Sequence, residues 1–246
     1  MNSTTIERDP CVSVFAQGLG EAFRRLDPHT QERFGLRAGM RAQLGVGVVD
    51  ITVAPWARPF LRLWSRQHIA VRRNGRNVPF TILNVPFIDA LGREGVTVSR
   101  RFFTRGAAAE PERFDATMLS AHVNGLVDDL LGSQQNVLAR LTVSVDERDG
   151  GMRFTSNGLR WIRRTGRQIV IPSLVAGQAS VHEWWDNSAE CFRISVEVRH
   201  PFLGTVFAYD GHFSVTEVNL SHPMIADALP CELRRIDGCE ETDSLL

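Results

Sequence analysis

Apolar and polar residues alternate along most of the chain with the two-residue period of β-strands. In Cys191–His200, every second residue from Phe192 to Val198 is apolar, and the residues between them are polar or charged. Val137–Asp146 follows the same pattern from Ala139 onward. Because successive side chains of a strand point to opposite faces, each of these strands has one apolar and one solvated face.

Roughly ten such segments follow one another after residue 67 without a helical pattern long enough for a parallel crossover. The predicted strands are 42–54, 78–85, 96–104, 114–121, 126–131, 137–146, 152–163, 168–171, 178–186, 191–200 and 205–218. Turn sequences such as GREG, RDGG and RTGR separate them. We therefore predict a mainly β fold, either a strongly curved antiparallel sheet or a closed β-barrel of roughly ten strands.

Helical spacing of apolar residues is confined to the N-terminal part, where helices are expected to pack against the barrel. Val14–Leu26 has this spacing, and Asp27 and Pro28 end that helix and begin a short second one as N-cap and first residue. Pro55–Gln67 is predicted to form another short helix. Its apolar face is expected to join the core or to plug one mouth of the barrel, and consists of Trp56, Phe60, Leu63 and Trp64.

The whole chain, 1–246, is expected to form a single domain. Its N-terminal part, 14–67, combines helices with one strand, and the antiparallel barrel spans 78–218. Polar sequences at 1–13 and 237–246 predict frayed, disordered tails.

Composition excludes several classes of function. The 28 basic and 28 acidic residues cancel, so no global field favours nucleic acid or anionic lipid. No apolar run approaches the roughly 18 residues of a membrane span. All basic residues are arginines, which removes lysine Schiff-base chemistry and a P-loop lysine. The four cysteines lack C-x-x-C spacing and the N-terminus lacks a signal peptide, so we expect a cytoplasmic protein with reduced thiols.

The pentapeptide HEWWD, residues 182–186, resembles part of the zinc-protease box H-E-x-x-H. A second histidine is missing, because Asp186 ends the segment, and on a strand His182 and Glu183 point to opposite faces. No metal site is therefore predicted. The stretch GVGVVD lacks the third glycine of a dinucleotide-binding loop, so no cofactor is predicted either.

Alternation places Glu183 on the inner face, beside Trp185. A carboxylate among apolar neighbours needs an ion-pair partner, such as an inward Arg160, or has a raised pKa. The first alternative gives a structural pair, and the second gives a general acid or base. Both alternatives stay open.

The same parity argument selects the other candidate site residues, which would face the barrel interior. The candidate catalytic residues are Glu183, Tyr209 and His200. The candidate ligand-binding residues are Trp185, Met118, Phe154, Arg160, Phe192, Phe207 and Phe213.

Several ordered motifs carry a resemblance to a known family. RFDATM (113–118), VDDLLGSQQNVLARLTVSV (127–145), FTSNGLRWI (154–162), VHEWWD, FRISVEVRHPFLG and FAYDGHFSV (207–215) resemble a bacterial family of uncharacterised domains, DUF4166. The amphipathic segment 19–35 is similar to the opening of that family. Members are also found appended to short-chain-dehydrogenase-like proteins, which implies small-molecule metabolism, and the family supplies no catalytic residues to carry over.

Two functions from different classes fit this sequence. The first is a cofactor-independent enzyme that binds a hydrophobic small molecule in a barrel pocket, as a cyclase or isomerase of bacterial specialised metabolism. The second is a non-catalytic lipid- or metabolite-binding barrel. A third interpretation is a structural partner domain for another enzyme, with an apolar surface around Trp56 and Trp64.

Overall fold

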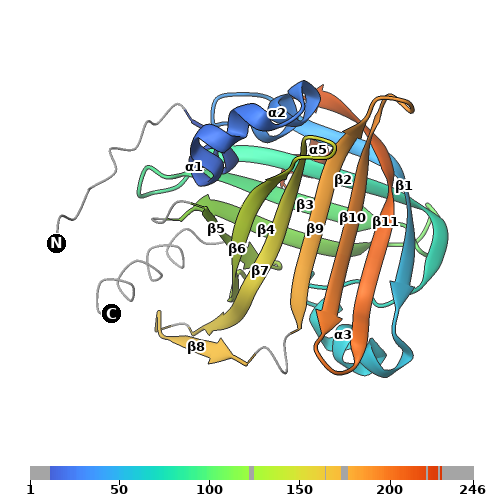
Figure 1. The fold of residues 1–246 in the computed structure, drawn as a ribbon. Helices are drawn as coiled ribbons and strands as arrows, with labels where there is room; N and C mark the ends of the chain where they lie inside the picture. The colour runs from blue at the N-terminus through green and yellow to red at the C-terminus, as the bar shows by residue number, and fades with distance from the viewer. Residues whose placement is uncertain are drawn as a thin grey trace.

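The computed structural model describes residues 12–121, 125–163, 165–172, 177–219, 221–226 and 228. Its fold is a closed barrel of ten antiparallel strands, as predicted (Figure 1). The strands are β1 Ala42–Val53, β2 Gly75–Ile88, β3 Glu94–Phe102, β4 Glu112–Ser120, β5 Leu126–Leu131, β6 Val137–Asp146, β7 Gly151–Ile162, β9 Gln178–Asp186, β10 Cys191–His200 and β11 Gly204–Val218.

Strand pairing follows the order of the chain around the barrel. Each strand pairs with its successor, except that β7 pairs with β9 along its first half and with β8, Gln168–Ile171, along its second half. β1 and β11 close the barrel through a register that runs from Ala42↔Val218 to Val53↔Phe207. The closed ring leaves no strand edge of the barrel unpaired along its centre.

The seam between β1 and β11 depends on glycine. A Cβ atom added at Gly47 would collide with the carbonyl oxygen of His212, and one at Gly211 would collide with that of Val48. We therefore expect Gly47→Ala to destabilise the protein by about 2 kcal/mol or more, because the strands must separate locally. Chemical denaturation measures this, and Thr52→Ala, at an exposed position of the same strand, should stay close to wild type. Equal stabilities of the two variants would contradict the close approach.

Short helices cover both ends of the barrel (Figure 1). At one end lie α1 Val14–Leu19, the 3-10 helix Gly20–Arg25 and α2 Pro28–Phe34. At the other end, the β1–β2 connection forms a 3-10 turn, Pro55–Ala57, and α3 Arg58–Ser65. Both helical regions thus limit the space inside the barrel along its axis.

Local sequence signals explain the first helices. Ser13 caps α1 by accepting a hydrogen bond from the Ala16 N–H, and Asp27 caps α2 by accepting one from the His29 N–H. Pro28 occupies the first turn of α2, so the predicted start of this helix is confirmed. The predicted helix Val14–Leu26 is instead interrupted at Gly20, whose φ of 58° ends α1 and begins the 3-10 turn.

Two further differences from the sequence-based prediction concern the ends of the chain. Ser13, assigned to the N-terminal tail, is buried and bonds the Phe34 carbonyl oxygen. Val12 of the same tail accepts a hydrogen bond from Gln17 Nε2 through its carbonyl oxygen, and the other residues of the two predicted tails, 1–11 and 237–246, lie outside the described residues. A short helix that was not predicted, α5 Pro223–Ala226, packs on the outer side of β1 and β2 through Ile225.

The apolar face predicted for 55–67 is only partly buried. Leu61 is buried and Trp64 packs against the core, whereas Phe60 and Leu63 are 69% and 58% exposed. The expected burial of these two side chains was wrong, because the helix turns Ala57, Leu61 and Trp64, which are spaced by four and three residues, toward the barrel and leaves Phe60 and Leu63 largely exposed. Within the described part of the chain, no helix is long and apolar enough to cross a membrane.

Candidate functional site

The barrel encloses a cavity of about 470 Å³ between its two helical ends. Phe15, Phe34 and Phe154 close the cavity on the α1–α2 side, where their rings pack against one another with centroids 5.0–5.8 Å apart. Trp56 and Trp64 bound it at the α3 end. A cavity of this volume is in the range of small-molecule sites, which are mostly apolar with a few placed polar groups.

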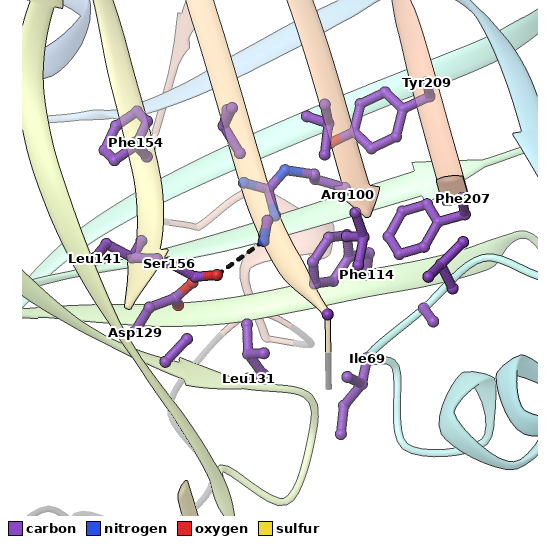
Figure 2. Close-up of a pocket in the computed structure, with 18 of the residues that line it drawn as sticks. Ile69, Arg100, Phe114, Asp129, Leu131, Leu141, Phe154, Ser156, Phe207 and Tyr209 are labelled. Atoms are coloured by element: carbon purple, nitrogen blue, oxygen red, sulfur yellow. Dashed lines mark hydrogen bonds between the residues drawn. The ribbon is translucent and has the colours of Figure 1, made fainter. Parts of the chain in front are cut away.

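The polar groups of the cavity wall centre on Arg100 of β3 and Asp129 of β5. Figure 2 shows the two side chains pointing toward one another across the interior, with Tyr209 on the neighbouring wall. The Arg100 guanidinium lies over the Phe114 ring, 5.0 Å from its centroid, which holds the cation at the cavity surface. A carboxyl group and a guanidinium cation therefore face each other inside a mostly apolar space.

Asp129 has the ionisation behaviour of a general acid or base. Burial raises the pKa of this carboxyl group to about 7, against opposition from the Arg100 charge and with a smaller contribution from Asp128. Desolvation wins because one cation cannot replace the water that both carboxylate oxygens lose. Near neutral pH the group can both give and accept a proton.

Several polar atoms of cavity-lining residues have no hydrogen-bond partner among the described residues. They are Arg33 Nη2, Asn84 Oδ1, Arg100 Nε, Asp129 Oδ1 and Tyr209 Oη. Burial also raises the pKa of the Tyr209 hydroxyl, so it stays a neutral donor. Buried polar atoms are nearly always bonded in folded proteins, so this set is suited to the polar group of a bound molecule.

Glu183 faces inward, as alternation predicted, and it is buried in an ion pair. Its Oε1 lies 2.7 Å from Arg33 Nε, and Arg33 Nη1 donates to Gln43 Oε1 at 3.1 Å. The Arg33 guanidinium lies 5.3 Å from the centroid of the Phe213 ring. The partner is thus an arginine of α2 rather than Arg160, and the pair fastens α2 to β9.

The other predicted site residues divide into two groups along the barrel axis. Those that line the cavity are Met118, Phe154, His200, Phe207 and Tyr209. Those that instead fill the end beneath α2 are Trp185, Phe192 and Phe213. Trp185 stacks on His29 of α2 at 4.1 Å, and Phe192 stacks on Phe213 at 5.6 Å. These three side chains point into the barrel, as alternation predicted, but they pack beneath α2 and do not line the cavity.

Arg160 does not line the cavity, and its predicted inward orientation was wrong. The β6–β7 register shifts between Ala139 and Leu141, because β7 has an additional residue between Ser156 and Leu159. This bulge reverses the parity of the strand, so Leu159 faces the cavity and Arg160 turns outward. There it donates a hydrogen bond to Gln168 of β8.

HEWWD forms the end of β9, and its His-Glu pair is split between the two faces. His182 lies outside, stacked on Trp184 at 4.4 Å, and its ring nitrogen is 3.2 Å from a carboxylate oxygen of Asp149. With Asp146 these groups place their potential ligand atoms within 4.8 Å of one another. Arg153 already pairs with Asp146, so the geometry is that of an ion-pair cluster beside a turn.

Sequence reasoning missed Arg100, Asp129 and Asn84. The alternation that directs Val98 and Phe102 inward also directs Arg100 inward, so that signal was present. For Asp129 it was ambiguous, because Asp128 and Asp129 each sit between apolar residues of β5. Asp128 turns outward and pairs with Arg140 at 2.9 Å.

Fold and cavity together define a class of protein: a ten-stranded antiparallel barrel with helices over both ends and a mostly apolar internal cavity that contains a buried arginine and a buried aspartic acid. The chain belongs to the DUF4166 family, whose model, described as a domain of unknown function, matches residues 26–213. It is also similar to the uncharacterized protein YndH of Bacillus subtilis (strain 168). The two are 29% identical over 197 residues, which cover 79% of this chain and 93% of that relative.

Proposed function

We propose that the barrel binds a hydrophobic small molecule with one polar group and acts on it as a cofactor-independent enzyme of the isomerase or cyclase class. The observation that carries this proposal is Asp129: a buried carboxyl group in an apolar cavity, with a pKa of about 7 and an oxygen without a partner. Glu183, another buried carboxylate of the cavity wall, is by contrast held in an ion pair, with its Oε1 2.7 Å from Arg33 Nε.

The proposed step is a proton transfer within the bound molecule. The Asp129 carboxylate takes a proton from a carbon next to a carbonyl group, the electron pair of that C–H bond forms a C=C bond to the carbonyl carbon, and the π pair of the C=O bond moves onto the oxygen. Arg100 and the neutral Tyr209 hydroxyl stabilise the resulting oxyanion. In a substrate with a C=C bond beside the carbon that loses the proton, protonated Asp129 then returns the proton to the far carbon of that bond, the carbonyl group forms again, and the C=C bond has moved by one position. In a cyclase, the apolar walls would in addition hold the folded conformer that closes a ring.

A non-catalytic binding protein is the second candidate. The mostly apolar lining and an opening at the α3 end support storage or transport of a lipid or metabolite. In that case Arg100 and Asp129 would contribute only to affinity and orientation. The two candidates differ in whether the bound molecule exchanges hydrogen with the protein.

Deuterium uptake by the bound molecule separates the candidates. The protein would be purified with its ligand, incubated in D₂O at neutral pH, and the extracted ligand analysed by mass spectrometry. The wild type should incorporate carbon-bound deuterium, because Asp129 exchanges its proton with solvent between turnovers. Asp129→Asn should bind the same ligand with uptake slowed roughly 100-fold or more.

Asp128→Asn is the matched control, because it makes the same replacement at the adjacent residue of β5, whose side chain lies on the outer face. Its ligand should gain deuterium at the wild-type rate. Bound ligand without deuterium uptake in the wild type would favour the binding protein, and equal uptake in Asp129→Asn and wild type would contradict the assigned base.

A further inference from the structure

Most of the large apolar side chains that are exposed in the described residues lie at one end of the barrel. The β1–β2 connection contributes Phe60 at 69% and Leu63 at 58% exposure, and the β10–β11 turn contributes Phe202 at 79%. The β7–β8 hairpin reaches the same end of the barrel, on the opposite side of the view from α3 (Figure 1). It adds Val170, which is 69% exposed. Single exposed apolar residues are ordinary, but a gathering of this size marks an interaction surface.

This apolar end is also where the cavity reaches the surface. Phe60 and Leu203 line the cavity and are nevertheless largely exposed. On α3, Leu61 and Trp64 face the cavity while Leu63 faces solvent. The short helix α3 therefore lies between the cavity and any partner that binds the exposed apolar side chains.

Charge is distributed unevenly around this end, although the chain as a whole is neutral. Residues 51–88 contain no acidic residue. Arg58, Arg62 and Arg66 are exposed on and just after α3, and they form no ion pair within the described residues. An exposed apolar surface bordered by unpaired arginines is complementary to an anionic, amphiphilic partner.

Beside α3, the arginines border a cleft of about 380 Å³. Six arginines and only two glutamates line it, namely Arg62, Arg66, Arg72, Arg73, Arg105, Arg113, Glu110 and Glu112. Glu112 is paired with two of these arginines: its Oε1 lies 3.6 Å from Arg72 Nε and 3.2 Å from Arg73 Nη1. The remaining positive charge of Arg62 and Arg66 suits a phosphate group, which guanidinium groups bind with parallel hydrogen bonds.

We propose that this end of the barrel docks onto the surface of an anionic phospholipid bilayer. Phe60, Leu63 and Phe202 enter the headgroup region, and Arg62 and Arg66 bind lipid phosphates. The cavity then opens toward the lipid phase, from which a hydrophobic molecule can reach it without crossing water. The docking surface stands apart from the proposed proton transfer, because none of these arginines belongs to the cavity wall.

Sedimentation with lipid vesicles tests the docking. The full chain is mixed with vesicles of phosphatidylcholine alone or of phosphatidylcholine with phosphatidylglycerol, at about 0.1 M salt, where the Debye length is about 10 Å. Binding should favour the anionic vesicles by at least roughly tenfold and weaken at higher salt. Arg62→Gln with Arg66→Gln should lose about fivefold for each arginine. Leu63→Ser with Phe202→Ser should lose roughly tenfold or more.

Matched controls carry the same chemical changes elsewhere on the surface. Val46→Ser with Ile88→Ser removes two exposed apolar side chains away from the α3 end, and Arg24→Gln with Arg148→Gln removes two exposed arginines at the opposite end. Both should bind vesicles as the wild type does. So should Asp129→Asn, so that failure of docking and failure of the proposed catalysis are distinguishable.

Two results would overturn the proposal. One is equal binding to neutral and anionic vesicles, or binding that the α3-end substitutions leave unchanged. The other is self-association of the chain that Leu63→Ser with Phe202→Ser abolishes while no vesicle is bound, because the occupant of the surface would then be a second copy.

Discussion

Replacing Arg33 with methionine should destabilise the protein by about 3–5 kcal/mol, because it leaves the Glu183 carboxylate buried without its cation. Both side chains are almost fully buried, at 1% and 5% exposure, so solvent cannot take over the missing interaction. Arg33 also links α2 to β1 through Gln43. The loss should appear in chemical denaturation as a lower midpoint with a similar slope.

The matched test of this reasoning is the double variant Arg33→Met, Glu183→Gln. It should recover a substantial part of the lost stability, since the unpaired charge is gone and both new side chains have volumes close to the originals. Destabilisation of the double variant equal to the sum of the two single variants would show that the pair does not act as a unit.

The second large effect is a pH dependence of stability that comes from Asp129. Its pKa is about 7 in the folded protein and near the usual 3.8 in the unfolded chain, so between these values the folded state binds the additional proton. Stability must then fall as pH rises through this window. The penalty at about pH 8 and above is on the order of 4 kcal/mol. Asp129→Asn removes it, because the amide is neutral at every pH.

Denaturation midpoints at several pH values between about 5 and 8 measure this effect. The wild type should lose stability toward higher pH, and Asp129→Asn should change much less and be the more stable form above neutrality. Asp210→Asn, at an exposed position of β11, should keep the wild-type slope. A wild type whose stability rises over this window, with Asp129→Asn parallel to it, would mean that Asp129 is ionised in the folded protein.

The strands were predictable because the two-residue period and the turn residues act locally. Leu126–Leu131, Val137–Asp146 and Gln178–Asp186 have the predicted bounds. The number of successive strands predicted either a strongly curved sheet or a closed barrel, and the pairing of β1 with β11 and of β6 with β7 shows the closed barrel.

Parity also placed Glu183 and Tyr209 inward correctly, but it failed wherever one residue changed the register. The bulge of β7 sits in Ser156–Leu159 and turned Arg160 outward. Its signal was Gly158, which has a φ of 113°, together with a change of the apolar positions from even to odd numbers, and the simple alternation did not take this into account. Asp129 could not be chosen over Asp128 because both have apolar neighbours at two-residue spacing.

The sequence also could not predict which of the inward residues line the cavity, and the reason is a different one. Trp185 and Phe207 have equivalent positions in the alternation, yet His29 of α2 covers Trp185 whereas Phe207 lines the cavity. The difference arises from where the helices rest on the barrel, which depends on long-range packing such as the Arg33–Glu183 pair.

Native mass spectrometry of the purified protein and of two matched variants tests directly whether the barrel interior holds a hydrophobic molecule. Ala139→Phe fills the cavity from β6, and Ala208→Phe places the same side chain on the outer face of β11. We expect an additional small-molecule mass on the wild type and on Ala208→Phe, and its absence from folded Ala139→Phe. A wild type with the mass of the polypeptide alone, or a ligand retained by Ala139→Phe, would contradict this expectation.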